Sequence, residues 1–368
     1  MPRIDEIFKL IKEQGASDLH VAAGAPPMIR LNGELQPVEP EPLTADLVED
    51  LLLEIMREEV RAEFQRENSV DFSYEVPGVV RMRANIYRHR DGLAAAFRML
   101  PTQILTVEQL GLPPQVLQLT ERTKGLVVVT GPPGTGKSTT LAAMIDHINA
   151  TRHHHIITVE DPIEFVHRNK ACLVNQREVG RHTPSFASAL RAALREDPNV
   201  ILVGEMRDLE TMELAVTAAQ TGTLVFGTLH TPSAAQTVDR IIDSFPVEQQ
   251  QQIRSMLGDS LQGVVAQRLV KRADGRGRVA ALEILICTPA IASHIRDRKT
   301  FQIPSVMQTS KREGMQLLDD ALGALVRERV VALEDALAFA SSREAVEHAA
   351  GLAGAGAAAP AAALRKAA

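Results

Sequence analysis

Residues 131–138 are Gly-Pro-Pro-Gly-Thr-Gly-Lys-Ser, and this stretch largely determines which fold the chain can have. It matches the pattern G-x-x-x-x-G-K-[ST], in which glycines let backbone N–H groups approach phosphate oxygens, lysine supplies a mobile positive charge and serine offers a ligand for Mg²⁺. The apolar run 126–129 predicts a buried parallel strand before it, and residues 138–149 predict a helix after it. This setting favours a phosphate-binding loop over a simple glycine-rich turn, with the contacts made by Gly131, Pro132, Gly134, Thr135, Gly136, Lys137, Ser138 and Thr139.

The composition is that of a globular protein without a dominant charge. The chain has 368 residues, 45% of them hydrophobic, with 40 Lys+Arg against 46 Asp+Glu, which allows two or three domains. The net charge of −6 and the aromatic content of 3% give no indication of nucleic acid as a partner. Cys172 and Cys287 form no CxxC pair, so neither a disulfide framework nor a zinc ribbon is expected. Without a signal peptide or an apolar run near eighteen residues, we expect a cytoplasmic protein with no transmembrane segment.

Residues 1–100 predict a small α+β domain. Helical spacing of apolar residues indicates helices over 3–14 and about 44–66, and Asn32-Gly33 predicts a tight turn between two short strands. Around Arg83 the sequence alternates strictly, so that basic residues and Met82, Ala84 and Ile86 fall on opposite faces of a strand. A return strand ends near Arg98. The basic face is either simply solvated or delivers arginine to a phosphate, which suits the planar fork of guanidinium donors.

Two acidic groups follow apolar strands in the second part of the chain. Glu160-Asp161-Pro162-Ile163-Glu164 follows the run 156–159, and Glu205 follows the run 200–203. Ligands bind at the carboxyl edge of parallel sheets, so Glu205 reaches the phosphate loop if its strand neighbours the strand before that loop. There it can orient or deprotonate a water molecule, or reach Mg²⁺ through water. The alternative is a charge at a helix N-terminus or on the surface.

Histidines occur at two places of interest. His230 ends the apolar run 224–229; a lone histidine is most often structural, but three strands that end in polar groups beside a phosphate loop predict a phosphate sensor. Residues 153–155 are three adjacent histidines, which do not share one face of a strand and therefore do not predict a metal site.

The remaining sequence is mainly helical. Asp208 is expected to cap a helix to about Thr221, further helices are expected over 234–243 and, largely, 248–269, and 278–286 has strand character. The predicted organisation is therefore an N-terminal domain (1–100), a linker (101–114), a nucleotide-binding core (115–288), a C-terminal helical region (289–345) and a disordered Ala/Gly-rich tail (346–368).

Together these residues resemble the retraction ATPases of type IV pili, the PilT family of the secretion-motor ATPase superfamily. The resemblance covers roughly residues 3–340 and rests on the phosphate loop with the run 138–144 after it, and on the segments 15–20, 26–30, 160–164 and 193–208. It implies an α/β fold: a RecA-like P-loop ATPase core with a PAS-like N-terminal α+β domain and a C-terminal helical region. It also implies a homohexamer that hydrolyses ATP with Mg²⁺.

The resemblance implies roles for individual residues. Lys137 and Ser138 would hold phosphate and Mg²⁺, Glu205 would be the catalytic carboxylate, and Glu164 would act at the metal, directly or through water, and at the attacking water. His230 would belong to a histidine box. Arg83 and Arg98 would be the arginines that the N-terminal domain offers to the nucleotide.

The implied partners follow from the same resemblance. They are an inner-membrane platform protein of the pilus and, as a second candidate, a paralogous pilus ATPase, with the chain lying peripherally at the inner face of the cytoplasmic membrane. The chain has no tetracysteine zinc element and no long N-terminal extension, which argues against the pilus assembly motor.

Two departures from the family pattern keep an alternative open. Thr223 stands where the histidine box usually has a second histidine, and residues 290–297 lack the first arginine and the asparagine of the motif linked to retraction. They motivate a second hypothesis, an accessory or regulatory nucleotide-gated pilus ATPase with little motor output of its own. A RecA-like motor on DNA is disfavoured by the acidic composition.

Overall fold

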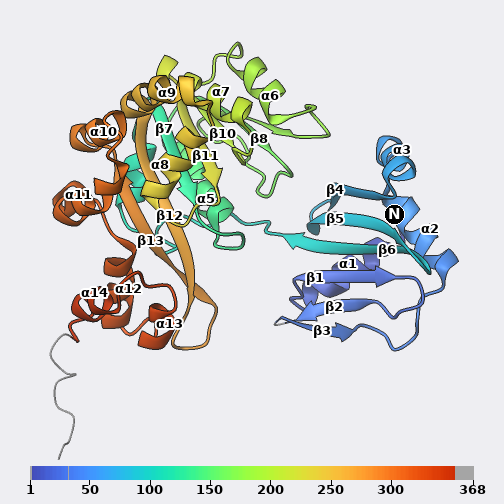
Figure 1. Ribbon diagram of the computed structural model, residues 1–368. Helices are drawn as coiled ribbons and strands as arrows, with labels where there is room; N and C mark the ends of the chain where they lie inside the picture. The colour runs from blue at the N-terminus through green and yellow to red at the C-terminus, as the bar shows by residue number, and fades with distance from the viewer. Residues whose placement is uncertain (1, 32, 353–368) are drawn as a thin grey trace, which may run out of the picture. The chain divides into compact units, whose positions relative to one another are not determined.

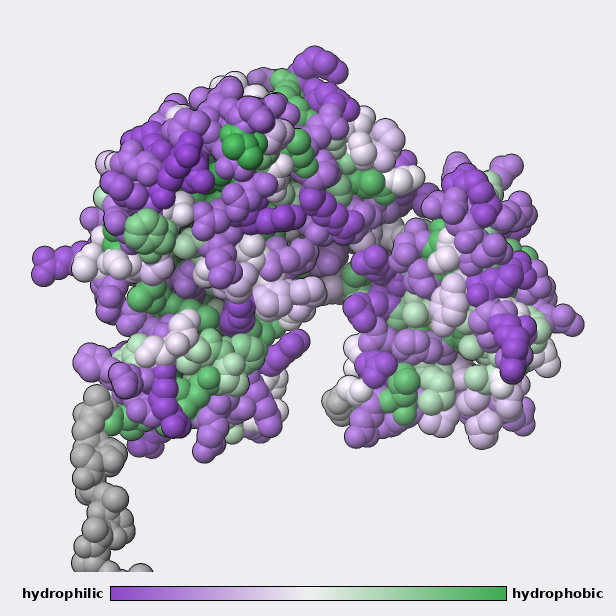
Figure 2. Space-filling view, in the orientation of Figure 1, coloured by the Kyte–Doolittle hydropathy of each residue, from purple (hydrophilic) through white to green (hydrophobic). Residues whose placement is uncertain are grey.

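The computed structural model describes residues 2–31 and 33–352, which form two compact units (Figure 1). One unit contains the chain up to Ile104 together with the short segment Pro162–Val166, and the other contains Leu105–Asp161 and the chain from His167 onward. Figure 2 shows mainly hydrophilic residues on the visible face of both units, because the large apolar side chains are collected in separate cores. No helix in the described part of the chain is long and apolar enough to cross a membrane.

The N-terminal unit is a six-stranded antiparallel sheet with the strand order β3-β2-β1-β6-β5-β4. Its elements are α1 (Ile4–Glu13), β1 (Asp18–Ala22), β2 (Met28–Leu31), β3 (Glu34–Pro37), α2 (Ala45–Ile55), α3 (Glu58–Glu67), β4 (Ser69–Val76), β5 (Val80–His89) and β6 (Gly92–Leu100). The predicted alternation of β5 is confirmed: Met82, Ala84 and Ile86 are fully buried, whereas Arg83 is exposed. The apolar face packs against the helices, with the rings of Phe8 and Phe97 4.9 Å apart.

The single helix expected over 44–66 is wrong, because the chain leaves the helical conformation between α2 and α3. Met56 and Arg57 are extended, with ψ values of 123° and 164°, and the Met56 side chain is buried in the core. The sequence offers no glycine or proline at this break, so periodicity alone could not locate it. Of the predicted Asn32-Gly33 turn, Asn32 lies outside the described residues, while Gly33 has φ 92° and Leu31 pairs with Glu34.

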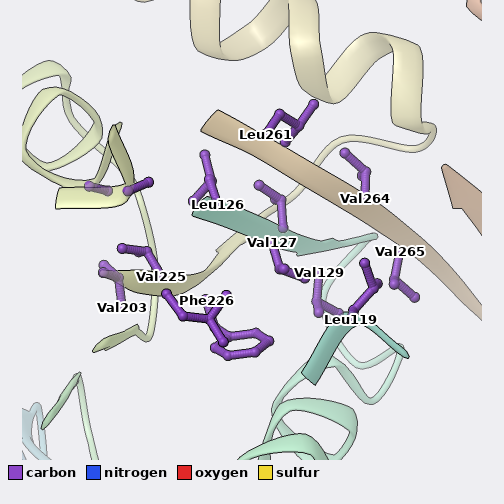
Figure 3. Packing of buried hydrophobic residues seen from close by; sticks show 14 of the residues in the cluster. Leu119, Leu126, Val127, Val129, Val203, Val225, Phe226, Leu261, Val264 and Val265 are labelled. Atoms are coloured by element: carbon purple, nitrogen blue, oxygen red, sulfur yellow. The ribbon is translucent and has the colours of Figure 1, made fainter. Parts of the chain in front are cut away.

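The larger unit is built on a seven-stranded sheet with the order β13-β12-β7-β11-β10-β8-β9, in which β13 alone runs antiparallel to its neighbour. The strands are β7 (Gly125–Thr130), β8 (His155–Glu160), β9 (Leu173–Glu178), β10 (Val200–Val203), β11 (Leu224–Leu229), β12 (Leu261–Lys271) and β13 (Arg278–Ile286). Central strands buried on both faces explain the continuous apolar runs in the sequence. Figure 3 shows Val127, Val129, Val225 and Phe226 packed in this core.

Helices accompany this sheet, and three of the six given next begin after a residue whose side chain caps the helix. They are α4 (Gln115–Thr120), α5 (Lys137–Thr151), α6 (Phe186–Ala193), α7 (Leu209–Thr221), α8 (Ala234–Asp243) and α9 (Val247–Ser260). The predicted cap at Asp208 is confirmed, since its carboxylate accepts the Thr211 N–H at 2.9 Å. Ser185 and Ser233 cap α6 and α8 in the same way.

The helix expected over 248–269 is correct only to Ser260, after which the chain forms β12 beside β7. Periodicity alone cannot assign an apolar run to a strand or to a buried helix. Here the β-branched pair Val264-Val265 favours a strand, and so does the close approach of the Gly263 backbone to the neighbouring strand β13. A Cβ on Gly263 would lie 2.8 Å from the Leu285 carbonyl oxygen of the next strand.

The C-terminal region is helical, as predicted, but it extends further than expected. It contains α10 (Pro289–Arg296), the 3₁₀ turn η1 (Thr300–Gln302), α11 (Ile303–Thr309), the 3₁₀ turn η2 (Lys311–Glu313), α12 (Leu318–Arg327), α13 (Leu333–Leu337) and α14 (Arg343–Ala349). The predicted start of a disordered tail at residue 346 is wrong: Val346 is fully buried in a small core under α12–α14, and Ala350 is buried as well. The tail residues 353–368 lie outside the described residues.

Candidate nucleotide-binding site

The phosphate loop connects β7 to α5 and has the geometry that its sequence predicts. Gly131, Gly134 and Gly136 have φ values of 140°, 76° and 85°, conformations that side-chain-bearing residues rarely adopt. At Gly131 the glycine is also required by space, because a Cβ would lie 2.5 Å from the Gln267 carbonyl oxygen. Helix α5 then begins at Lys137, so its first N–H groups and the positive end of its dipole face the loop. This is a typical anion-binding arrangement.

Lys137 lies at the centre of the loop. Its side chain is buried, and Nζ donates to the carbonyl oxygens of Gly131 at 2.9 Å and Pro132 at 3.1 Å. Nζ also lies 3.3 Å from Nδ1 of His230. The ammonium group therefore lies within the loop, where two carbonyl oxygens and a histidine ring nitrogen can accept its hydrogen bonds.

His230 connects this lysine to Glu205. Its Nε2 lies 3.0 Å from Oε1 of Glu205, while Nδ1 faces Lys137. Because the ammonium group can only donate and the carboxylate can only accept, the neutral imidazole with its proton on Nε2 satisfies both contacts. Glu205 is in turn paired through Oε2 with Nε of Arg207 at 2.8 Å, and Arg207 lies 3.6 Å from Asp161.

The strand order explains how these groups meet. We expected Glu205 to reach the loop through direct neighbourhood of its strand with β7; this condition is not met, because β11 lies between β7 and β10. His230, which follows β11, bridges the intervening distance. The predicted convergence of Lys137, Glu205 and His230 is thus present, but it depends on the histidine as a link.

Gln267 of β12 forms hydrogen bonds to the phosphate loop and to α5, and the sequence analysis did not identify it as a site residue. Its Nε2 donates to the Thr135 carbonyl oxygen at 2.6 Å, and its Oε1 accepts the Thr140 hydroxyl at 2.8 Å. Only 3% of the residue is exposed. The available signal was the amide that directly follows the apolar run 264–266, and it was missed because the segment was expected to be helical.

Glu164 lies outside the larger unit that contains this group. It lies in Pro162–Val166, which belongs to the N-terminal unit, where Arg81 donates from Nη2 to the Ile163 carbonyl oxygen at 3.1 Å. Its part at the metal and the attacking water stays a prediction. Among residues 2–31 and 33–352, no cluster of three His, Cys, Asp or Glu side chains is arranged to hold a metal by itself.

The predicted arginines of the N-terminal unit do lie together. Arg83 of β5 and Arg98 of β6 are directly opposite in the sheet register. They line a pocket of about 250 Å³ whose other lining residues are mostly polar, namely Asp18, His20, Arg30, Asp71, Asn85 and Ala96. Each arginine has a carboxylate partner, since Nε of Arg98 lies 2.9 Å from Asp18 and Nε of Arg83 lies 3.4 Å from Asp71.

The buried carboxylate of Asp18 is charged in this pocket. Burial raises its pKa, but hydrogen bonds from Ser17 and Arg98 outweigh this, so the pKa lies below the ordinary value. Arg98 is therefore held in place by a fixed anion while most of its side chain stays exposed to solvent. An anion entering the pocket would meet an oriented guanidinium group.

The two departures from the family pattern lie elsewhere. Thr223 precedes β11, whereas His230 follows it, so the two positions are separated by the length of the strand, about 20 Å. The altered segment forms α10, which Thr288 caps and in which Ala292 is buried. Neither position contacts Lys137, Glu205 or His230 in the hydrogen bonds described above.

Comparison with known proteins agrees with this geometry. Residues 1–338 match the Type II/IV secretion system protein family. The chain is 53% identical to the type IV pilus retractation ATPase PilT of Pseudomonas aeruginosa, over 90% of this chain and 96% of the relative. It is 50% identical to the twitching motility protein of Neisseria gonorrhoeae, over 87% and 86% of the two chains.

A solved structure extends the similarity to the fold. The crystal structure of the pilus retraction motor PilT with bound ADP superposes with a TM-score of 0.85 at 49% identity, covering 91% of this chain and 97% of that chain. The predicted α/β class with a RecA-like core is confirmed. The PAS-like character of the N-terminal domain stays a prediction.

Proposed function

The chain belongs to the Type II/IV secretion system protein family, and from this membership we propose that it is an ATP-hydrolysing motor that drives the retraction of type IV pili and thereby twitching motility. The observation that carries the proposal is the linked group of Lys137, His230 and Glu205 at the phosphate loop. The relatives named as a retraction ATPase and a twitching motility protein, and the PilT structure with bound ADP, support the same function and nucleotide binding.

The proposed chemistry assigns one task to each member of the group. The N–H groups of the loop and Lys137 bind the phosphates, and Glu205 orients the attacking water and accepts its proton. His230 contacts both residues, so it is placed to respond when the γ-phosphate is lost. Arrangement of fixed charges in this way is the main source of catalysis in phosphoryl transfer.

The chemistry of the proposed ligands suits a magnesium ion. Ser138 lies in the first turn of α5 next to Lys137, and its hydroxyl is a hard oxygen donor of the kind that Mg²⁺ prefers; the carboxylate oxygens of Glu205 and Glu164 are donors of the same kind. Ser138 would hold the ion directly and Glu164 directly or through water. When bound, Mg²⁺ would neutralise charge on the phosphate oxygens.

The active assembly in this proposal is a homohexamer. Arg83 and Arg98 are oriented by Asp71 and Asp18 on one face of the N-terminal sheet, where they could serve the nucleotide of a neighbouring subunit. The motor would work at the inner face of the cytoplasmic membrane, on a platform protein of the pilus, with a paralogous pilus ATPase as a second candidate partner.

Deletion of the gene and complementation test this function directly. We expect the deletion strain to carry more surface pili and to lose twitching, and we expect wild-type protein, but not Glu205→Gln, to restore movement. A deletion strain that retracts and twitches like the parent contradicts the proposal. If the purified protein hydrolyses ATP and the deletion changes retraction only when a paralogous ATPase is also absent, the accessory role is supported instead.

A further inference from the structure

Three threonine hydroxyls form a chain of hydrogen bonds beside the phosphate loop. Thr130 is the last residue of β7, directly before Gly131, and its Oγ1 lies 2.8 Å from both the carbonyl oxygen and Oγ1 of Thr231. Oγ1 of Thr231 lies 2.7 Å from Oγ1 of Thr237 in α8. Thr130 and Thr237 are fully buried. We call these three residues the threonine chain.

The donors in the threonine chain can be assigned. The Thr237 hydroxyl lies 2.8 Å from the carbonyl oxygen of Ser233, where it is the donor because a carbonyl oxygen can only accept. Since a hydroxyl has one proton, the Thr231 hydroxyl is the donor to Thr237. The Thr130 hydroxyl then donates to Thr231, with its proton shared between two oxygens of that residue. The chain therefore starts at Thr130 and runs towards α8.

The register of the sheet explains why Thr130 meets Thr231. β7 and β11 are parallel neighbours, and Thr130 lies opposite Leu229, the last residue of β11. The chain therefore continues through His230 beside the start of the phosphate loop. Because the Thr130 hydroxyl reaches the Thr231 carbonyl oxygen, it holds the main chain one residue beyond His230.

These contacts close a ring that includes the lysine of the loop. Nζ of Lys137 donates to the Gly131 carbonyl oxygen at 2.9 Å and lies 3.3 Å from Nδ1 of His230. Gly131 is covalently joined to Thr130, and His230 is covalently joined to Thr231. The hydrogen bond between the two threonines joins these branches. The imidazole is thus held relative to the ammonium group through the main chain as well as through the side-chain contact.

Glu205, the other contact of His230, is held separately. The Thr228 hydroxyl donates to the carbonyl oxygen of Gly204, and the N–H of Met206 donates to the carbonyl oxygen of Thr228 at 3.1 Å. The residues on both sides of Glu205 are therefore tied to β11. Loss of the threonine chain should thus displace His230 while Glu205 stays in place.

We propose that Thr130 is a positioning residue for ATP hydrolysis. Through Thr231, its hydroxyl keeps the imidazole of His230 between the ammonium group of the loop and the proposed catalytic carboxylate. The inference rests on the proposed function, because it gives His230 a part in hydrolysis. Misplacement of a catalytic group by about 1 Å can cost a large part of its effect, so this hydroxyl influences the rate of the chemical step from outside the group itself.

ATP turnover of the purified full chain, measured by phosphate release with Mg²⁺, tests this inference. Thr130→Val keeps the shape of the side chain and removes the hydroxyl, so kcat should fall about 5- to 50-fold, as where a buried carbonyl oxygen loses its donor. The KM for ATP should stay within about threefold of the wild-type value, because Lys137 and the N–H groups of the loop are unchanged. Thr130→Ser retains the hydroxyl and should restore kcat to within about threefold of the wild type.

A double-mutant cycle with His230→Ala distinguishes positioning from a general effect on the fold. If Thr130 acts through His230, Thr130→Val should lower kcat by less than about twofold in the His230→Ala protein. A loss by the same factor in both backgrounds overturns the inference. Thr221→Val is the matched control and should turn over ATP like the wild type, because this exposed residue ends α7 and its hydroxyl donates to the Thr217 carbonyl oxygen of the same helix at 2.9 Å.

Two further measurements keep the test decisive. Thr231→Val removes one of the two acceptors of Thr130; it replaces Thr130→Val if that protein fails to fold, and should lower kcat about two- to tenfold. If His230→Ala hydrolyses ATP too slowly for the cycle, a crystal structure of the Thr130→Val protein decides. Nδ1 of His230 should then lie more than about 4 Å from Nζ of Lys137, beyond hydrogen-bonding distance, and an unchanged contact overturns the inference.

The outcomes separate this inference from the proposed function. If His230→Ala lowers kcat and Thr130→Val does not, the inference is wrong and the function stands. If the wild-type protein does not hydrolyse ATP, or if His230→Ala turns over ATP like the wild type, the proposed part of His230 in hydrolysis is wrong, and the inference that rests on it is wrong too.

Discussion

Replacing Gln267 by leucine should weaken nucleotide binding, although every residue proposed to contact phosphate stays unchanged. The side chain supplies a donor to the Thr135 carbonyl oxygen and an acceptor to the Thr140 hydroxyl, and it is 3% exposed. Leucine of similar size leaves two polar groups without their partners, each at a cost of about 1 to 3 kcal/mol. The sum, about 2 to 6 kcal/mol, is an upper bound because the loop can relax and admit water.

Part of this cost should appear as lost affinity. If about 1 to 3 kcal/mol is needed to restore the binding conformation of the loop, the dissociation constant for ADP should rise about 5- to 150-fold, since each 1.4 kcal/mol corresponds to a factor of ten. The rest should lower the free energy of unfolding. Calorimetric titration with ADP and urea denaturation measure the two parts separately.

Gln262 provides a matched control on the same strand, since its side chain does not contact the phosphate loop in the hydrogen bonds described above. Gln262→Leu should bind ADP as the wild type does. The reasoning is refuted if Gln267→Leu binds ADP within twofold of the wild type, or if both glutamine variants lose affinity equally, because the effect would then belong to the strand rather than to the loop contacts.

Three further predictions concern the catalytic group, the shared site and the pH dependence of stability. Glu205→Gln should retain ADP binding while ATP turnover falls about 10²- to 10³-fold in a phosphate-release assay; near wild-type turnover would remove Glu205 from catalysis. Mixing Arg83→Ala with Lys137→Ala protein should restore part of the hydrolysis if sites are shared between subunits, and absence of recovery at every ratio would argue against sharing. Burial lowers the pKa of His167 to about 4 from 6.5, so the unfolded chain binds more protons between these values and the free energy of unfolding should decrease as pH falls from 6.5 towards 4. His167→Leu should reduce this decrease in urea denaturation at pH 7 and pH 5; an identical decrease in both proteins would contradict the assignment.

Much of the larger unit could be predicted because its strands are buried on both faces. In a chain with a phosphate-loop pattern, continuous apolar runs such as 126–129, 200–203 and 224–229 are best explained as buried parallel strands. All three form strands of one sheet. Where a segment is apolar but short, as in 261–269, the same pattern suits helix or strand, and only the neighbouring β7 decides. The break between α2 and α3 likewise depends on burial of Met56 by tertiary contacts.

The candidate site was predictable to a different degree for each residue. Lys137 could be identified from the phosphate-loop pattern, and Glu205 and His230 because polar residues just after apolar strands lie at a known edge of the sheet. Their linkage could not, since it depends on strand order, which a single sequence does not specify. Gln267 contacts residues that are more than 100 positions away in the sequence, and no local sequence pattern predicts such a contact.

The positions where the chain departs from its family bear on how hydrolysis and movement are related. Thr223 lies at the end of β11 opposite His230, and Ala292 is buried in α10, which packs against α9, so neither belongs to the linked group of Lys137, His230 and Glu205. The loop, its support by Gln267 and the linked group of Lys137, His230 and Glu205 are all complete. We therefore expect that a defect arising from the altered α10 lowers pilus retraction per ATP hydrolysed while the rate of hydrolysis itself stays unchanged.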